Sequence, residues 1–319
     1  MRALSYSRYG GPEVLQAVDL PCPKPGSGEI LVKVEACALN GADYEIMTGW
    51  PIYSRMWGWM RPKIGVLGSD VAGYVEAVGT GVDGFAVGDA VIGELFEHWG
   101  GLAEYVTAPA SLWVMKPEAL PFVDAAALPQ AGVLALQATR DVVAGQRVLI
   151  AGAGGGVGTF ALQMVKAKGA HAVAEDNATK GERLRELGAD VVLDYRADDV
   201  AALGLRFDLI IDCVCGRPVL QSRRLLKPGG RFWFIGGPLG ASLIAGIAGP
   251  ILSRFDSRDV RLLLWDRNPR DVEQLAQMAV EGQIVPVIDK VFPLGDAPGA
   301  MQRLGSGQSV GKVMVAAEN

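Results

Sequence analysis

The sequence predicts an α/β protein in which a doubly wound parallel-sheet domain is inserted into a small β-barrel domain. Two observations predict this fold. A glycine-rich turn between a strand and a helix lies in residues 147–176, and strands and helices alternate from there to about residue 284. Short strands separated by turn residues occupy most of the rest of the chain. We therefore expect a barrel domain of residues 1–121 plus 285–319 and a dinucleotide-binding domain of residues 122–284.

The glycine-rich turn has the chain order of a Rossmann dinucleotide-binding unit. An apolar run at Val148 to Ile150 is typical of a strand buried on both faces, and Phe160 to Val165 has the spacing of a helix with one buried side. A second strand, Ala170 to Ala174, then ends at the acid Glu175. Strand, glycine turn, helix, strand and acid in this order bind a dinucleotide.

The glycines of the turn suit a phosphate ligand. Those at 154–156 let the backbone approach a pyrophosphate without a Cβ atom in the way, and Gly158 lets the helix pack against the strand. Free N–H groups at the helix start attract the phosphates. The residues expected around the pyrophosphate are Gly154, Gly155, Gly156, Val157 and Gly158. Because Ala153 stands where the strict pattern has its first glycine, a glycine-rich turn without a ligand is the alternative.

Composition excludes several classes of protein. The chain has 319 residues, 30 basic and 35 acidic, and its net charge of −5 gives no general attraction for nucleic acid or acidic lipid. Its N-terminus lacks the apolar core of a signal peptide. The most apolar segment, Leu239 to Leu252, is too short to span a bilayer, and we expect a buried or interface helix there. The four cysteines show no metal spacing, so we expect a reduced, cytoplasmic protein.

The periodicity of the chain predicts the elements of both domains. Barrel strands are expected at Ile30–Ala36, Val71–Val78, Asp89–Gly93, Ala103–Ala108, Val287–Phe292 and Lys312–Ala316. In the inserted domain, helices are expected at Asp124–Val143, Lys180–Leu187, Leu220–Leu226 and Pro269–Glu281, the last capped by Asn268, and strands at Val191–Asp194, Phe207–Asp212, Arg231–Ile235 and Val260–Trp265. The ligand cleft should lie between the domains, at the strand ends near Gly155, Val214 and Gly236.

Nine short motifs occur in one order along nearly the whole chain. They are G-P-E-V-L at 11–15, A-L-N-G-A-D at 38–43, L-G-S-D-V-A-G at 67–73, V-G-D at 87–89, A-G-A-G-G-G-V-G at 151–158, L-G-A-D at 187–190, D-L-I-I-D at 208–212, L-K-P-G-G-R at 226–231 and G-K-V at 311–313. With these motifs the chain resembles the medium-chain dehydrogenase/reductase superfamily. Within it, the chain is similar to the zinc-independent quinone oxidoreductases, the zeta-crystallin-like group. The resemblance implies a Rossmann domain inserted into a GroES-like barrel.

The two zinc sites of the related alcohol dehydrogenases are expected to be absent. Those enzymes carry a metal-binding cysteine in the segment where this chain has Asn40, and a histidine and a glutamate where it has Ser69 and Asp70. Serine and asparagine side chains are poor zinc ligands. His98 has no partner at ligand spacing, and no four-cysteine lobe lies near residues 94–104.

Loss of the metal predicts a change of reaction. Without a Lewis acid, alcohol oxidation becomes difficult, whereas a quinone or a conjugated enone accepts a hydride with orientation and one hydrogen-bond donor. The resemblance implies that Asn40 and Asp43 line the nicotinamide end of the cleft; an asparagine can instead close a turn, and an aspartate can cap a helix. The family often has a tyrosine where this chain has Glu45, and Tyr44 is adjacent. Asn40, Asp43 and Tyr44 are therefore the candidate catalytic residues.

The adenosine end of the cofactor site should be acidic. Glu175 lies 20 residues after Gly155, the separation at which an acid reaches a ribose hydroxyl, and Asp176 adds a second negative charge. Both favour NAD(H); NADP(H), which many relatives use, is the alternative if Lys180 or Arg183 binds a phosphate instead of facing solvent. The further residues expected to contact the cofactor are Lys180, Tyr195, Val214, Gly236 and Lys312.

Three expectations about function and assembly complete the interpretation. The leading hypothesis is a reductase of quinones or enones. The alternatives are an enoyl reductase or zinc-free alcohol/aldehyde oxidoreductase of a biosynthetic pathway, and a non-catalytic dinucleotide-binding redox sensor. The aromatic segment Trp50 to Lys63 is either a lid over a flat substrate or ordinary packing. Relatives pair through the strand at Val260 to Trp265, so we expect a homodimer.

Overall fold

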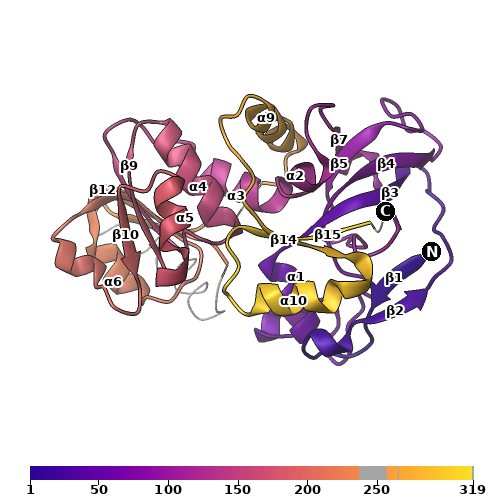
Figure 1. Ribbon diagram of the computed structural model, residues 1–319, viewed down its shortest axis with the longest axis horizontal. Helices are drawn as coiled ribbons and strands as arrows, with labels where there is room; N and C mark the ends of the chain where they lie inside the picture. The colour runs from indigo at the N-terminus through magenta and orange to yellow at the C-terminus, as the bar shows by residue number, and fades with distance from the viewer. Residues whose placement is uncertain (237–256, 265, 318–319) are drawn as a thin grey trace. The chain divides into compact units, whose positions relative to one another are not determined.

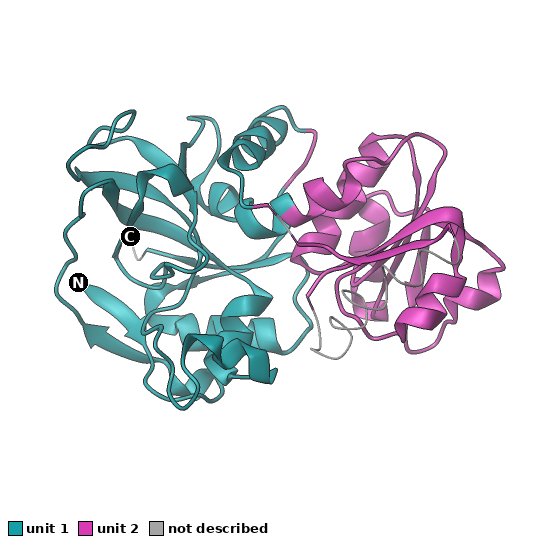
Figure 2. Cartoon of the chain, turned by 180° about the vertical axis from the view of Figure 1, so that it is seen from behind, with its two compact units in different colours: residues 1–133, 267–282, 286–319 teal, residues 134–266, 283–285 magenta. Residues whose placement is uncertain are grey.

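The computed structural model describes residues 1–236, 257–264 and 266–317, which form two compact units. Unit 1 comprises residues 1–133, 267–282 and 286–319, and unit 2 comprises residues 134–266 and 283–285 (Figure 2). From the sequence, the predicted domains are a barrel of residues 1–121 plus 285–319 and a dinucleotide-binding domain of residues 122–284. The compact units differ from this division mainly at 122–133 and 267–282, two segments that cluster with the barrel.

Unit 2 contains a parallel sheet of six strands in the order β10-β9-β8-β11-β12-β13. The strands are β8 (Arg147–Ala151), β9 (His171–Asp176), β10 (Val191–Asp194), β11 (Phe207–Asp212), β12 (Leu226–Phe234) and β13 (Asp259–Leu262). Helices α4 (Gly156–Ala167), α5 (Gly181–Glu186) and α6 (Val219–Arg224) connect them and pack on the sheet (Figure 1). In chain order the strands run 3-2-1-4-5-6, the order of the Rossmann fold.

The sheet of unit 2 forms where the sequence is continuously apolar. Val148, Leu149 and Ile150 of β8 are fully buried because strands pair on both sides and helices cover both faces. Phe207, Phe232 and Phe234 fill the opposite half of the same core. The predicted doubly wound sheet is therefore confirmed.

Unit 1 contains a sheet of seven strands, in the order β14-β15-β3-β4-β5-β7 with β6 paired to β3. The strands are β3 (Glu29–Leu39), β4 (Asp70–Val78), β5 (Ala90–Glu94), β6 (Tyr105–Pro109), β7 (Trp113–Met115), β14 (Ile288–Pro293) and β15 (Lys312–Ala316); β1 (Arg2–Ser5) and β2 (Gln16–Asp19) form a separate pair. Strand β15, from the end of the chain, pairs antiparallel with β3 (Figure 1). This pairing brings Lys312 to the start of helix α1 (Gly41–Thr48).

The helices of unit 1 are short. Besides α1 they are α2 (Phe122–Ala126), the start of α3 (Pro129–Thr139), α9 (Pro269–Val280) and α10 (Ala297–Gly305). Short 3₁₀ helices lie at Pro12–Val14 (η1), Ile52–Trp57 (η2), Ala110–Leu112 (η3) and Leu294–Asp296 (η7) in unit 1, and at Ala178–Lys180 (η4) and Val200–Leu203 (η5) in unit 2.

Two sequence predictions need correction, and two lie partly or wholly outside the described residues. The single helix expected over Asp124–Val143 is two helices, because Pro129 disfavours helical geometry in the residue before it. The strand expected from Ala103 begins at Tyr105. The apolar segment 239–252 lies outside the described residues, as does residue 265 at the end of the predicted last strand. The Asn268 cap of α9 is confirmed, since its side chain accepts a hydrogen bond from the backbone N–H of Arg270.

None of the helices in the described part of the chain has the length and apolar character needed to cross a bilayer.

Candidate functional site

The glycine turn of unit 2 connects β8 to α4. Gly152 has a positive φ of 76°, a conformation that side chains disfavour, and Gly155 caps the start of α4. The N–H groups of Gly152 and Ala153 donate to the carbonyl oxygen of Glu175, at 2.8 and 3.1 Å. The turn is therefore fixed to the end of the neighbouring strand β9, while the first N–H groups of α4 lack intrahelical acceptors, as at any helix start.

A Cβ atom would meet different neighbours at each glycine of the turn, so the glycines have different roles. At Gly158 it would lie 2.3 Å from the carbonyl oxygen of Gly152, so a side chain here would push the helix off the turn. At Gly154 it would lie 2.4 Å from Cδ of Lys180. At Gly155 the nearest atom would be 3.4 Å away, an ordinary contact. Gly158 thus closes the packing of helix on strand, and Gly155 leaves open space at the helix start, as a pyrophosphate cradle requires.

The acid predicted to bind the ribose, Glu175, is buried at the end of β9 and forms an ion pair with Arg217. Burial raises the pKa of Glu175, and the guanidinium opposes that shift. Arg217 was not among the sequence-predicted residues. It lies in the loop after β11, and nothing in its local sequence indicates that it faces an acid 42 residues earlier.

The second acid, Asp176, holds together the turn and the start of the next helix. Its carboxylate accepts hydrogen bonds from the N–H groups of Gly154 and Asn177, both at 2.8 Å, and pairs with the Lys180 ammonium at 3.1 Å. Both charged side chains are buried. Arg183, the other proposed phosphate ligand, forms an exposed ion pair with Glu186.

The remaining cofactor residues predicted in unit 2 lie at the same edge of the sheet. Tyr195 follows β10, Val214 follows β11 and Gly236 follows β12, and all three are exposed. A residue that sequence reasoning missed, Asp212, shapes this edge. Its buried carboxylate accepts from the N–H groups of Val214 (3.1 Å) and Cys215 (2.7 Å), which fixes the loop that presents Val214.

Unit 1 contains a second group of polar side chains, which we call the buried polar cluster: Asn40, Asp43, Ser69, Asp70 and Lys312. The Lys312 ammonium lies between Oδ1 of Asn40 (2.5 Å) and Oδ2 of Asp70 (3.5 Å). The Asn40 amide donates to Asp70 at 2.9 Å and, more weakly, to Ser69 at 3.5 Å. Elements far apart in the chain thus satisfy one another's polar groups, as burial demands.

The candidate catalytic residues have structural partners in this cluster. The backbone N–H groups of Asn40 and Gly68 donate to the two oxygens of Asp43, so Asp43 caps helix α1. Burial raises the pKa of Asp43 to about 7. Tyr44 packs near Gly305 of α10. The structure brings Asn40 and Asp43 together; their catalytic role, and that of Tyr44, stay predictions.

Lys312 belongs to this cluster, since both contacts of its ammonium are in unit 1; its cofactor contact stays a prediction. These contacts also bear on the metal. The zinc enzymes that the chain resembles carry a metal-binding cysteine in the segment of Asn40 and a glutamate at Asp70. In this chain, an oxygen of each of these two side chains already contacts the Lys312 ammonium. The side chains here therefore do not fit zinc. Among residues 1–236, 257–264 and 266–317, no three His, Cys, Asp or Glu side chains gather as a metal site.

Glu94 is the second residue that sequence reasoning missed. It lies opposite Asp70 in the β4–β5 pair and is buried. Its Oε1 accepts from the N–H of Phe96 at 3.0 Å, whereas Oε2 has no hydrogen-bond partner. Burial, and then the nearby Asp70 charge, raise the pKa of Glu94 to about 8, so the carboxyl group is mostly protonated at neutral pH.

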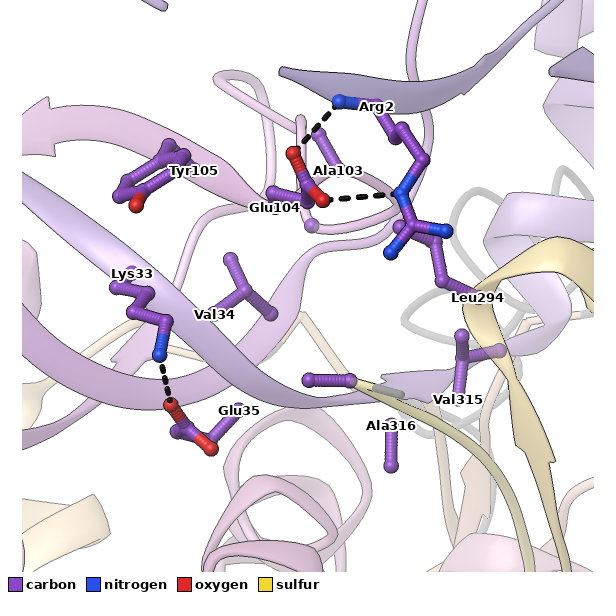
Figure 3. A pocket seen from close by; sticks show the side chains of 12 residues that line it. Arg2, Lys33, Val34, Glu35, Ala103, Glu104, Tyr105, Leu294, Val315 and Ala316 are labelled. Atoms are coloured by element: carbon purple, nitrogen blue, oxygen red, sulfur yellow. Dashed lines mark hydrogen bonds and ion pairs between the residues drawn. The ribbon is translucent and has the colours of Figure 1, made fainter. Parts of the chain in front are cut away.

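A pocket of about 320 Å³ opens elsewhere in unit 1 (Figure 3). Two ion pairs lie at this pocket, Arg2 with Glu104 at 3.0 Å and Lys33 with Glu35 at 3.3 Å. Its lining includes none of the site residues predicted from the sequence. The strand ends of unit 2 and the buried polar cluster of unit 1 therefore remain the two candidate sites, each within its own unit.

Comparisons with known proteins agree with this arrangement. Residues 26–118 match the family described as the alcohol dehydrogenase GroES-like domain, and residues 187–315 match the family described as zinc-binding dehydrogenase. A chloroplast envelope quinone oxidoreductase homolog of Arabidopsis thaliana is 34% identical over 99% of this chain and 98% of its own.

Solved structures give the same result. The quinone oxidoreductase from Coxiella burnetii superposes with a TM-score of 0.90, at 30% identity over 100% of this chain and 99% of its own. The Escherichia coli quinone oxidoreductase complexed with NADPH superposes with a TM-score of 0.86, at 25% identity over 99% and 100%. The chain belongs to the medium-chain dehydrogenase/reductase superfamily. Within that superfamily it is a member of the quinone-oxidoreductase-like group, an oxidoreductase that uses a nicotinamide cofactor.

Proposed function

We propose that the protein passes a hydride from a nicotinamide cofactor to a quinone or an α,β-unsaturated carbonyl. The observation that carries this proposal is the C-terminal edge of the sheet in unit 2, where the glycine turn, the paired acids and the loops after β10, β11 and β12 come together. Open α/β sheets bind their ligands at this edge. The similarity to enzymes named quinone oxidoreductases supports this acceptor class.

The residues of unit 2 fit a dinucleotide. Gly154 to Gly158 would hold the pyrophosphate, because the first N–H groups of α4 lack intrahelical acceptors and the glycines put no side chain between them and the ligand. Glu175 would face the adenosine ribose. The nicotinamide supplies the hydride when bound. The protein's part is to orient the acceptor and exclude water, and the chemistry needs no metal if the acceptor is already electron-poor.

A substrate panel tests this proposal. We expect cofactor oxidation with small quinones and enones, and little with saturated aldehydes. Oxidation of aldehydes, or of thioester-linked enones alone, would favour the biosynthetic alternatives. Cofactor binding without oxidation of any acceptor would favour a redox sensor. Fluorescence titration of bound cofactor, run in parallel, separates failure to bind from failure to react.

We further propose that activity needs no zinc and that NADH is the preferred cofactor. The ammonium of Lys312 in the buried polar cluster supports the first proposal, and the acids Glu175 and Asp176 support the second. Activity lost to a chelator and restored by zinc would contradict metal independence. The solved relative bound to NADPH makes the cofactor preference a point to measure, and the Discussion gives that test.

A homodimer in the cytoplasm completes the proposed function. Among the described strands, β13 is the last of the sheet in unit 2, and no described strand pairs with its outer edge, which could therefore pair with a second copy. Sedimentation at micromolar concentration should give the mass of a dimer, and a monomer would contradict this. Fractionation of cells tests the compartment.

A further inference from the structure

Five large apolar side chains in one segment of unit 1 are exposed, and we call them the tryptophan–methionine face. They are Trp50 (73% exposed), Ile52 (40%), Met56 (77%), Trp59 (70%) and Met60 (88%). Sixteen large apolar residues of the described chain are exposed, and these five fall within eleven consecutive positions; the others are scattered. Single exposed apolar residues are ordinary, whereas five of them in one short segment indicate a candidate binding surface.

Residues between the members of this face make contacts with the rest of unit 1. Trp57 packs edge-on against Phe96, with ring centroids 5.7 Å apart. The Tyr9 hydroxyl donates to the carbonyl of Gly58, and the Arg55 guanidinium lies 4.8 Å from the centre of the Tyr9 ring. The aromatic segment Trp50 to Lys63 therefore contains both packed and exposed aromatic residues. Trp57 anchors it to the barrel, and the five residues of the face are exposed.

The charge of the segment is one-sided. Arg55, Arg61 and Lys63 lie within or just after the face, and no aspartate or glutamate occurs between Glu45 and Asp70. Burial raises the pKa of the Glu45 carboxyl, whose oxygen accepts from the Tyr53 hydroxyl at 3.1 Å. The chain as a whole carries −5, so this local cationic character is opposite in sign to the protein.

We propose that the tryptophan–methionine face binds the surface of an anionic lipid membrane. Tryptophan beside lysine and arginine is the combination that proteins use at the boundary between headgroups and acyl chains. The net charge alone predicted no attraction for acidic lipid, and the local distribution changes that expectation. A second copy of the chain fits less well, because in a two-fold dimer made through this face each set of cations would meet an identical set.

Vesicle sedimentation with the full chain tests the apolar part. We expect binding to phosphatidylserine-containing vesicles, weak binding to pure phosphatidylcholine, and a loss of about tenfold in partitioning for Trp59→Ser/Met60→Ser. Val87→Ser/Val143→Ser is the matched control, since these side chains are 68% and 59% exposed and lie outside the tryptophan–methionine face, and it should bind like the wild type. Both substituted positions of the test variant are exposed, so folding should be unaffected; circular dichroism checks this.

The charges give a second, independent variant. Arg61→Gln/Lys63→Gln should weaken binding about tenfold, as should raising the salt, whereas Lys24→Gln/Arg270→Gln removes the same net charge from exposed sites elsewhere and should not. No binding to anionic vesicles, or binding that neither test variant changes, would overturn the proposal. A raised quinone KM without vesicle binding would identify a substrate lid, and a change of oligomeric state would identify a self-interface. Either result also overturns it.

Discussion

Asp176 and Lys180 pair four residues apart in unit 2, whereas Asp70 and Lys312 pair 242 residues apart in unit 1. The first pair forms within one turn and its helix, beside a cradle of glycines. The second forms only when the last strand of the chain has docked against β3. Asp70 is 0% exposed and Lys312 is 2% exposed. Both pairs are buried, but the local pair lies at the end of β9, where the cofactor is proposed to bind, and the distant pair joins β4 to β15 in the core.

This difference determines what each pair costs to break. A buried charge that loses its partner keeps its full desolvation penalty. Charges at a strand end can recover part of it from water or from a ligand. Changes in the buried polar cluster should therefore affect stability first, and changes at the glycine turn should affect cofactor binding first.

The largest expected effect is that of Lys312→Met. It leaves the Asp70 carboxylate buried without its ammonium and should lower the free energy of unfolding by about 3–5 kcal/mol. Urea denaturation followed by circular dichroism measures it. Lys24→Met, at an exposed position, should change little. The double variant Lys312→Met/Asp70→Asn should recover part of the loss. If the single and double variants are equally unstable, charge burial is not the cause.

The pH dependence of stability tests the same region through Glu94. Its pKa is raised from 4.5 to about 8 by folding, so the folded chain holds a proton that the unfolded chain releases. The contribution of the Glu94 proton to the free energy of unfolding is fully present below pH 4.5, falls as the pH rises, and is lost once the pH passes about 8. The slope is at most about 1.4 kcal/mol per pH unit.

Glu94→Gln should remove that slope. The variant and the wild type should be similar near pH 4.5, and the variant should gain in relative stability up to about pH 8. Glu273→Gln, at an exposed site of unit 1, is the control. Parallel stability curves for wild type and Glu94→Gln would show that Glu94 ionises as easily in the folded protein as in the unfolded chain.

The sequence predicted the local features of both units well. The alternation of strands and helices is legible because each element carries its own hydrophobic period. Strands β10, β11 and β15 lie at the predicted residues, and the Asn268 cap forms as expected. The glycine turn was identified because its chemistry lies within about thirty residues of chain.

Side-chain partners far apart in sequence could not be predicted in this way. Nothing near Glu175 indicates Arg217, and nothing near Asn40 indicates that Lys312 takes the oxygen of its amide. Glu94 reads as one polar residue at the end of a strand. Only the register of β4 with β5 places it beside Asp70 and makes it an acid with a raised pKa.

Gly158 and Gly155, two glycines of one turn, test whether a residue serves the stability of the fold or the binding of the cofactor. Gly158→Ala should lower stability by about 1–3 kcal/mol, because the new methyl would meet backbone atoms of Gly152 and Ala153. Gly155→Ala should cost less than about 1 kcal/mol, since the nearest atom is 3.4 Å away, yet weaken NADH binding about tenfold. Thermal unfolding and fluorescence titration give the two values. Equal loss of stability in both would mean that Gly155 is also needed for packing.

The last expected effect, on cofactor preference, concerns the pair of Glu175 and Arg217. Glu175→Ser should weaken NADH binding by about 1–3 kcal/mol, the size of a charged hydrogen bond, and leave Arg217 free to meet a 2′-phosphate. The preference for NADPH should therefore rise about tenfold, on the order of 1.4 kcal/mol. Arg217→Gln should shift it the other way, because the Glu175 charge is then unopposed.

Dissociation constants of both cofactors, measured by fluorescence titration of the four proteins, decide the question. Glu182→Ser is the fourth protein and the control, since it removes one exposed acid from helix α5 of the same unit. Its ratio of NADH to NADPH affinity should stay within about twofold of the wild type, because exposed charges are screened. Opposite shifts in Glu175→Ser and Arg217→Gln would show that the pair sets the preference. If both variants shift the ratio in the same direction, or neither does, the ion pair does not set the cofactor preference. The pair would then stabilise the fold, as the buried pair of Asp70 and Lys312 does in unit 1.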